Sequence, residues 1–222
     1  PIATFNTPYT VDEGDGVISG TLTAWNDDDE AVTYAARGSA VDGLTITANT
    51  GAWSFDPNDA AYDHIKKGDT LGVDVLYTVT DALGVEDDTG KFTITLTGTN
   101  DAPVATFSTA QSATEGGDAL SGNVTATDAD DNHTVTFTVK GDAISGLGLT
   151  TTGAWTFDPK HSAYNSLKQG ATKDVTVTYI VTDEHAATDE GSFTITVTGT
   201  NDAPVATFST AQSATEGAAA IS

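Results

Sequence analysis

One stretch of this chain occurs twice without a single change, at 98–116 and again at 199–217. Both copies read GTNDAPVATFSTAQSATEG, and they lie 101 residues apart. A more divergent version opens the chain at 1–14. Self-similarity at a fixed period indicates tandem repeats, and about 100 residues is a common size for a domain with one hydrophobic core. We therefore predict two domains, 1–101 and 102–202, followed by the start of a third repeat at 203–222.

Within each repeat, apolar side chains alternate with mostly polar ones over short runs. The clearest runs are 73–80 and 92–97, where valine, tyrosine, phenylalanine, isoleucine and leucine recur at every second position. This period of two is typical of strands with one buried face. About seven such strands, separated by turn signals, indicate an immunoglobulin-like sandwich. We expect the other strands at 18–24, 32–34, 44–47 and 52–56, and their counterparts at 120–126, 135–139, 147–150 and 154–158.

The segment 58–67 breaks the strand pattern. It lies between Pro57 and Gly68 and has Tyr62 and Ile65 three positions apart. These boundaries and this spacing predict about two turns of helix, and the second repeat has an equivalent segment. The prediction is therefore an all-β chain of two sandwiches, head to tail, each with one short helix. The aromatic residues expected in the two cores are Trp53, Phe55, Trp155 and Phe157.

The charge is strongly one-sided. Only 8 lysines and arginines face 32 aspartates and glutamates, for a net charge of -24. This excludes nucleic acid as a partner on electrostatic grounds and argues against an anionic membrane surface. No apolar run is long enough for a membrane-spanning helix. A chain with this much like charge repels itself unless salt or bound cations compensate it.

The chain has no cysteine, so disulfides and thiolate metal sites are excluded. The four histidines have no histidine counterpart in the other repeat, which excludes a histidine site common to both. The acidic residues behave differently, because most keep an acidic or amide counterpart. The matched sets are Glu13 with Glu115 and Glu216, Asn26 with Asp128, Asp28 with Asp130, Asp81 with Asp183, and Asn100 and Asp101 with Asn201 and Asp202.

The order of the strands predicts where these residues lie. In a sandwich that the chain enters at one end and leaves at the other, the turn after the first strand lies at the exit end. The loop at 128–132 and the end of the strand at Asp183 lie at the entry end of the second repeat. These elements and the linker should converge at one joint, without lysine or arginine. The residues expected there are Glu13, Asn100, Asp101, Asp128, Asp130 and Asp183.

Two further sets would belong to neighbouring joints and are incomplete in this chain. Glu115, Asn201 and Asp202 would serve the joint after the second repeat. Asn26, Asp28 and Asp81 would serve a joint before the first repeat. We therefore expect the chain to be part of a longer array.

Clustered carboxylates need compensation. Two like charges 4 Å apart repel by about 4 kcal/mol at an effective dielectric constant near 20. Ca²⁺ takes 6 to 8 oxygen ligands in flexible geometry and suits such a set better than the strictly octahedral Mg²⁺. Asp128, Asp130 and Asn132 have the spacing of the first ligands of an EF-hand, but His133 and Val139 stand where that loop needs glycine and glutamate. An EF-hand is thereby excluded.

At these residues the chain resembles a known module. The GTNDAPV run, the Asp-x-Asp loop, the GAWxFDP strand and the VTD strand end resemble the VCBS repeat, a cadherin-like module found in tandem in giant bacterial surface adhesins, often of the RTX type. The resemblance covers nearly the whole chain. It implies an extracellular stalk that projects a ligand-binding domain from the bacterial surface for adhesion and biofilm formation. Its partners would be neighbouring repeats, and the fragment itself would be a monomer.

The joint is also similar to the cadherin linker, with its Asn-Asp-x-Asn-x-Pro pattern. That resemblance implies that Glu13 is the acidic ligand at the base and that Asn100 and Asp101 are the linker ligands. It gives the upper loops the ligands Asp128, Asp130 and Asp183. Ala102 replaces the second asparagine of the pattern, and no segment matches the mid-domain acidic motif of cadherins. These departures leave the number of Ca²⁺ ions at the joint open, and they favour one over three.

Two other functions remain to be weighed. A carbohydrate- or protein-binding module would use exposed loops, with Trp25 as its best residue because the counterpart is Thr127. A glycoside hydrolase would use two carboxylates, but the matched acids fall in turns at domain ends, and no nucleophile and base pair is visible. We expect no enzymatic activity. The tail at 203–222 is expected either to remain without a partner strand or to pair with the edge strand of another molecule.

Overall fold

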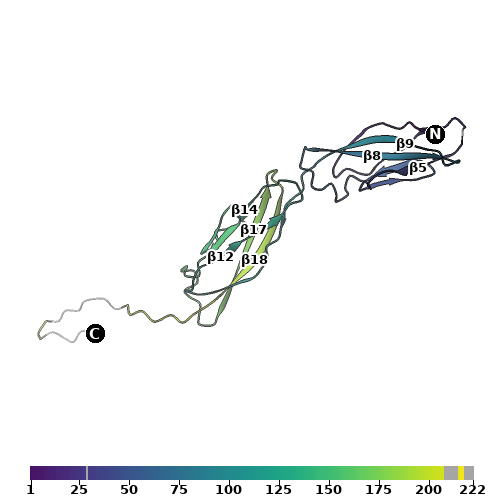
Figure 1. The fold of residues 1–222 in the computed structure, drawn as a ribbon. Coiled ribbons are helices and arrows are strands. Elements are labelled where there is room, and N and C mark those ends of the chain that lie inside the picture. Colours follow the sequence, from purple (N-terminus) through teal and green to yellow (C-terminus); the bar gives the residue numbers. More distant parts are fainter. Residues whose placement is uncertain (29, 208–214, 218–222) are drawn as a thin grey trace.

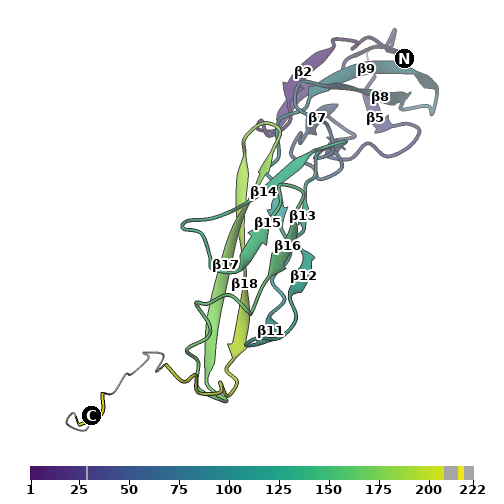
Figure 2. The ribbon, with the colours of Figure 1, turned by 90° about the vertical axis from the view of Figure 1, so that its left-hand side faces the viewer.

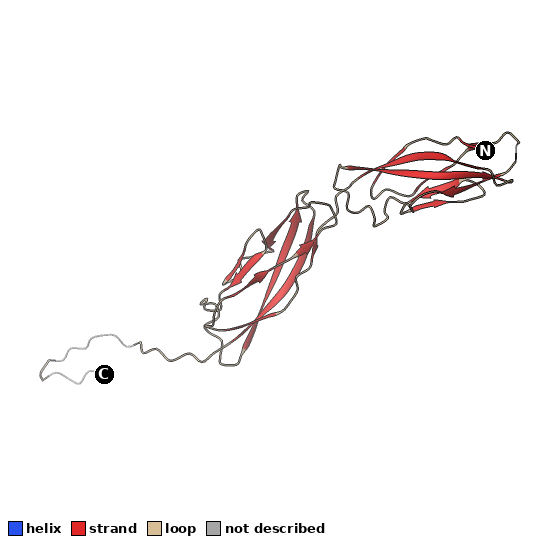
Figure 3. Ribbon diagram, viewed as in Figure 1, coloured by secondary structure: helices blue, strands red, loops and turns tan. Residues whose placement is uncertain are grey.

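The computed structural model describes residues 1–28, 30–207 and 215–217. The strand expected from the start of a third repeat lies largely outside these residues. Every regular element in the described part of the chain is a β-strand (Figure 3). The strands form two sandwiches placed end to end, and Figures 1 and 2 show the joint between them from two sides. The prediction of an all-β chain with two tandem sandwiches is confirmed.

Each sandwich has the same nine strands. The first contains β1 (Ile2–Ala3), β2 (Tyr9–Asp12), β3 (Ile18–Thr21), β4 (Ala24–Trp25), β5 (Val32–Ala36), β6 (Leu44–Ile46), β7 (Ala52–Phe55), β8 (Thr70–Asp81) and β9 (Glu86–Thr97). The second contains β10 (Val104–Ala105), β11 (Gln111–Thr114), β12 (Leu120–Asn123), β13 (Ala126–Thr127), β14 (Val135–Val139), β15 (Leu147–Leu149), β16 (Ala154–Phe157), β17 (Thr172–Asp183) and β18 (Thr188–Thr198).

Two sheets face each other in each sandwich. In the first, the larger sheet has the order β2-β9-β8-β5 and the smaller has the order β3-β7-β6. The larger sheet is antiparallel except for β2, which runs parallel to β9. The second sandwich repeats this order with β11-β18-β17-β14 and β12-β16-β15. Because β2 and β9 run in the same direction, both end at the side of the first sandwich from which the chain leaves.

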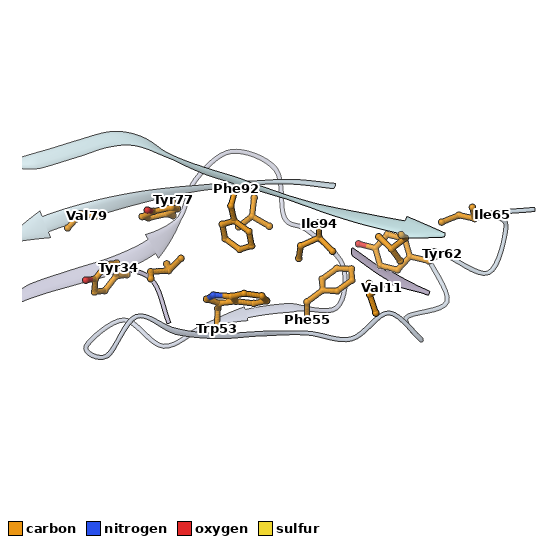
Figure 4. Packing of buried hydrophobic residues seen from close by; sticks show 13 residues of the cluster. Val11, Tyr34, Trp53, Phe55, Tyr62, Ile65, Tyr77, Val79, Phe92 and Ile94 are labelled. Carbon is orange, nitrogen blue, oxygen red and sulfur yellow. The ribbon is translucent and has the colours of Figure 1, made fainter. Parts of the chain in front are cut away.

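The core of each sandwich lies between the two sheets. Alternate residues of the long β8–β9 hairpin point inward, as the period of two predicts. Trp53 and Phe55 from the opposite sheet are 2% and 0% exposed, and the Trp53 ring lies 5.0 Å from that of Phe92 (Figure 4). Trp155 and Phe157 occupy the same places in the second core. The prediction that these aromatic residues are core residues is confirmed.

The first residues of each sandwich are hydrogen-bonded to its long central strands. In the second sandwich, the Tyr179 hydroxyl donates to the Phe107 carbonyl oxygen at 2.9 Å and accepts from the Phe107 amide at 3.1 Å. The Asp189 carboxylate accepts a hydrogen bond from the Ala105 amide at 2.9 Å. These bonds hold the segment that follows the linker against β17 and β18, so the linker has a fixed point on its second side.

The prediction of a short helix at 58–67 is wrong. The segment 58–67 forms successive turns, in which the Tyr62 amide donates to the Asp59 carbonyl oxygen and the Ile65 amide to the Tyr62 carbonyl oxygen, each at 2.9 Å. These are three-residue spacings, and so short a segment gains few helical bonds for the cost of nucleation. Tyr62 and Ile65 are nevertheless buried on one side, because residues three apart share a side in both geometries. The second sandwich has the same turns around Tyr164.

Gly98 positions the linker against these turns. It exchanges backbone hydrogen bonds with Gly68 and Asp69, each of 2.9 Å, and a methyl group there would collide with the carbonyl oxygens of Ile65 and Lys66. We expect Gly98→Ala to lower the free energy of unfolding by about 1–3 kcal/mol, measured by urea denaturation. The control is Gly72→Ala, whose methyl group meets only Thr93, at 3.8 Å. Equal stabilities of the two variants would contradict this close packing.

Candidate metal site at the joint

The exit end of the first sandwich places a buried carboxylate beside the linker. Glu13 follows β2 and is 6% exposed. Its amide donates to the Thr97 carbonyl oxygen at 2.9 Å, which continues the parallel pairing of β2 with β9. Its Oε2 accepts a hydrogen bond from the Thr99 amide at 3.0 Å. The carboxylate is therefore held at the point where the chain leaves the sandwich.

The entry end of the second sandwich contributes three more carboxylates. Asp130 lies in the loop before β14 and is 4% exposed, and its amide donates to Asp128 Oδ1 at 3.1 Å. Asp183 ends β17 and is 8% exposed. Its Oδ1 accepts hydrogen bonds from the amides of His185 and Ala187, each at 2.8 Å. Asp183 thus shapes the β17–β18 hairpin while its other oxygen faces the linker.

The linker joins the two ends through side chain and backbone. Asn100 Nδ2 donates to Asp183 Oδ2 at 2.8 Å, and the Asp101 amide donates to Asp130 Oδ2 at 3.1 Å. The structure therefore brings together the residues that strand order placed at this joint: Glu13, Asn100, Asp101, Asp128, Asp130 and Asp183.

The charges at the joint act on one another. Burial raises the pKa of Glu13, of Asp101 and of Asp130, and in each case neighbouring carboxylates raise it further. Burial also opposes ionisation of Asp183, but hydrogen bonds from Asn100, Ala187 and His185 outweigh it and leave its pKa lowered. The joint therefore contains three carboxyl groups for which burial and neighbouring negative charges disfavour the ionised form.

Three of the carboxylate oxygens at the joint are buried without a hydrogen-bond partner: Asp101 Oδ2, Asp128 Oδ2 and Asp130 Oδ1. Buried polar atoms are nearly always paired, and an unpaired carboxylate is costly. Oxygens of this kind are the ligands that hard cations such as Ca²⁺ take. In the described part of the chain, however, no three aspartate, glutamate, histidine or cysteine side chains are grouped as a ready metal site. These oxygens are suitable ligands for a cation, but they are not already arranged as a complete coordination site.

A groove of about 380 Å³ opens beside these oxygens. It is lined by Asp101 and Asp128 and, from the first sandwich, by Asp63, whose charge raises the pKa of both Glu13 and Asp101. Asp63 was not expected at the joint, because its segment was predicted to be a helix. Its counterpart, Asn165, is an amide like Asn26, so matching of acidic and amide residues could have found it.

The two incomplete sets lie at the outer ends. Glu115 repeats the geometry of Glu13: its Oε2 accepts from the Thr200 amide at 2.9 Å, and its Oε1 is buried without a partner. Asp81 repeats that of Asp183, with its Oδ1 accepting from the Leu83 and Val85 amides at 2.9 Å each. Asn201, Asp202 and Asp28 are exposed, and Asn26 is half-buried.

Lysine also reaches the joint, which the sequence did not lead us to expect. Lys66 pairs with Glu184 at 2.8 Å, and this is the only ion pair between the two sandwiches in the described residues. Hydrogen bonds from Lys66 and from the Thr134 amide lower the pKa of Glu184 to about 2. The pair lies beside the carboxylate cluster and uses none of its three unpaired oxygens.

Trp25 lies at the entry end of the first sandwich, opposite Ile2 in the β1–β4 pair, and is 52% exposed. It is not part of the joint described above. In the described residues we find no helix with the length and hydrophobicity needed to cross a membrane.

Comparison with known families and structures agrees with the fold. A family model described as "Bacterial Ig domain" matches residues 100–196, which is most of the second sandwich. Among curated proteins, a sequence search finds no match to this chain.

Solved structures of cadherin repeats are similar to the whole chain. A human protocadherin-24 EC1-2 fragment aligns with 91% of this chain and 99% of its own length, at 17% identity and a TM-score of 0.53. Mouse cadherin-23 EC22-24 aligns with 90% of this chain and 65% of its own length, at 17% identity and a TM-score of 0.52. Drosophila N-cadherin EC1-4 aligns with 88% of this chain and 48% of its own length, at 16% identity and a TM-score of 0.50. At this identity the likeness establishes the fold: tandem sandwiches of the cadherin type.

Proposed function

We propose that this chain forms two links of an extracellular stalk in a bacterial surface adhesin, with Ca²⁺ at the joint between the sandwiches. The role is structural rather than catalytic, and its partners are neighbouring repeats of the same protein. The tandem cadherin-like fold, the match to a bacterial immunoglobulin domain, and the resemblance of the linker to VCBS repeats support a stalk.

One observation supports the ion above all others: three buried carboxylate oxygens from the linker and the second sandwich have no partner. Glu13 and Asp63 add negative charge from the first sandwich. A cation that accepted Asp101 Oδ2, Asp128 Oδ2 and Asp130 Oδ1 would remove the repulsion and the unpaired oxygens together. Ca²⁺ suits a mixed set of carboxylate, amide and water oxygens, because its coordination is flexible.

The ion would act on the angle between the sandwiches. Without it, carboxylates on both sides of the linker repel each other, so the angle between the sandwiches varies more than when the ion is bound. With it, the two ends share ligands and the angle is fixed. Calcium sites in extracellular modules bind at roughly 10⁻⁴ to 10⁻³ M, so the calcium of the medium would keep the stalk stiff.

Titration calorimetry with Ca²⁺ tests this proposal directly. We expect saturable binding with a dissociation constant of roughly 10⁻⁴ to 10⁻³ M and weaker binding of Mg²⁺ under the same conditions. Small-angle scattering of the same sample should show a longer and narrower distribution of maximum dimensions in Ca²⁺ than in chelator. Absence of saturable binding would refute the metal site, and binding without a change in scattering would refute the effect on the angle.

A further inference from the structure

A second set of contacts crosses the joint away from the linker. The Lys66 ammonium group, on the exit turns of the first sandwich, lies 2.8 Å from Glu184 Oε1 in the β17–β18 hairpin. The Asp131 amide donates to the His64 carbonyl oxygen at 3.0 Å. Both contacts border a groove of about 210 Å³ that is separate from the carboxylate groove. The sandwiches are therefore attached at the linker and at a point beside it.

Glu184 connects three segments at this second point. Its Oε1 meets Lys66 of the first sandwich, and its Oε2 accepts a hydrogen bond from the Thr134 amide at 2.8 Å. The loop before β14, the β17–β18 hairpin and the exit turns are thus tied together through one carboxylate. An ammonium–carboxylate contact and a backbone hydrogen bond that lie off the linker oppose rotation about it. Bonds to charged groups are also shorter and stronger than neutral ones.

The two sandwiches differ at these positions. The first sandwich has Ala82 where the second has Glu184, and Ala31 where the second has Thr134. The lysine, in contrast, is present in both, because Lys168 is the counterpart of Lys66. Lys168 lines a groove at the exit end of the second sandwich together with Asn201 and Asp202. The exit ends are therefore alike in this lysine, whereas only one of the two entry ends carries the acid.

We propose that Lys66 and Glu184 form an orientation latch that needs no bound cation and selects the module that follows. An entry end with a glutamate in its hairpin fits a lysine-bearing exit end, and an entry end of the first-sandwich type does not. By the same geometry, Lys168 presents a docking face for a following module with an acidic hairpin. No atom of the latch is one of the proposed calcium ligands, although the charge of Glu184 acts on the neighbouring Asp130.

Distance measurements in chelator test the latch. The chain has no cysteine, so Ser19→Cys and Ser121→Cys, at exposed and equivalent positions, allow one spin label on each sandwich. Pulsed electron resonance in chelator should give a narrower distance distribution for the labelled parent protein than for variants that lack the latch. We expect Lys66→Ala and Glu184→Ala each to broaden it, and the exchange Lys66→Glu with Glu184→Lys to restore it only in part, because lysine cannot accept the hydrogen bond from the Thr134 amide. Glu184→Ala also imitates the first sandwich, which has alanine there.

Lys168→Ala is the matched control, because it removes the equivalent lysine at an end that carries no following sandwich in the described residues. It should leave the distribution unchanged. The proposal is overturned if Lys66→Ala or Glu184→Ala leaves the parent distribution intact in chelator. Calorimetric titration of the same variants with Ca²⁺ keeps the two proposals apart, because loss of the latch leaves the calcium ligands in place.

Discussion

Replacement of Asp130 with asparagine should remove about half or more of the calcium-dependent rise in melting temperature. Asp130 is 4% exposed and has one unpaired oxygen at the joint, while its other oxygen accepts the Asp101 amide. Asparagine keeps the size of the side chain and can still accept that bond, but it removes the charge. We expect calcium affinity to fall at least about tenfold, because ligand charge tunes such sites over decades.

The size of the effect follows from linkage. A ligand at 100 times its dissociation constant stabilises the folded state by about 2.7 kcal/mol, and a tenfold loss of affinity removes about 1.3 kcal/mol of this. For a domain of about 100 residues, 1 kcal/mol corresponds to roughly 4–8 °C in melting temperature. Differential scanning calorimetry with and without Ca²⁺ measures this increment for the parent and the variant.

Two further variants sharpen the measurement. Asp28→Asn changes the exposed counterpart of Asp130 at the outer end of the first sandwich and should leave the increment unchanged. Addition of Asp183→Ala to Asp130→Ala should abolish the increment. It should also lower stability in chelator, since Asp183 accepts the hairpin amides of His185 and Ala187. If parent and double variant shift equally with calcium, the ion does not bind at this joint.

The second large effect is a rise in stability on mild acidification in chelator. Burial raises the pKa of Glu13, Asp101 and Asp130 above their ordinary values of 4.5 and 3.8. A carboxyl with a raised pKa binds its proton more tightly in the folded state. Its stabilisation is therefore complete below the ordinary pKa and is lost as pH rises through the raised value. We expect the melting temperature to rise as pH falls from 7 toward the ordinary pKa values of these carboxyls.

At lower pH the trend should reverse. Hydrogen bonds lower the pKa of Asp183, Asp87 and Asp189. The stability that these groups contribute is present above their ordinary pKa and is lost as pH falls through the lowered value. Melting curves in chelator from pH 3 to pH 8 should therefore pass through a maximum.

Two controls identify the source of the maximum. Saturating Ca²⁺ should remove the fall in melting temperature between the maximum and neutral pH, because the ion rather than a proton then compensates the carboxylate cluster. Asp130→Asn should reduce the neutral slope in chelator. A parent protein whose stability only falls from pH 7 downward would show that the charges of the cluster do not strain the joint.

The fold was largely predictable because its signals are local. The exact repeat of 98–116 defines the period, and alternation in runs such as 92–97 indicates strands with one buried face. The short helix was the error, because residues three apart share one side both in a helix and in a series of turns. The three-residue backbone hydrogen bonds of Tyr62 and Ile65 identify this segment as turns.

The convergence of the candidate site was also predictable, because the direction of the strands places Glu13 and Asp183 at facing ends of adjoining sandwiches. The residues that differ between the repeats were not. Glu184 has alanine as its counterpart, so comparison of the repeats discards it, and Asp63 was missed because its segment was predicted to be a helix.

The sequence by itself determined two sandwiches in tandem and an acidic joint between them, because periodicity and matched residues depend on neighbours along the chain. Only the tertiary structure decided which carboxylate oxygens are buried without a partner and that Lys66 reaches Glu184. Pairing of that kind depends on how the two ends pack across the linker. No local pattern in the chain encodes that packing.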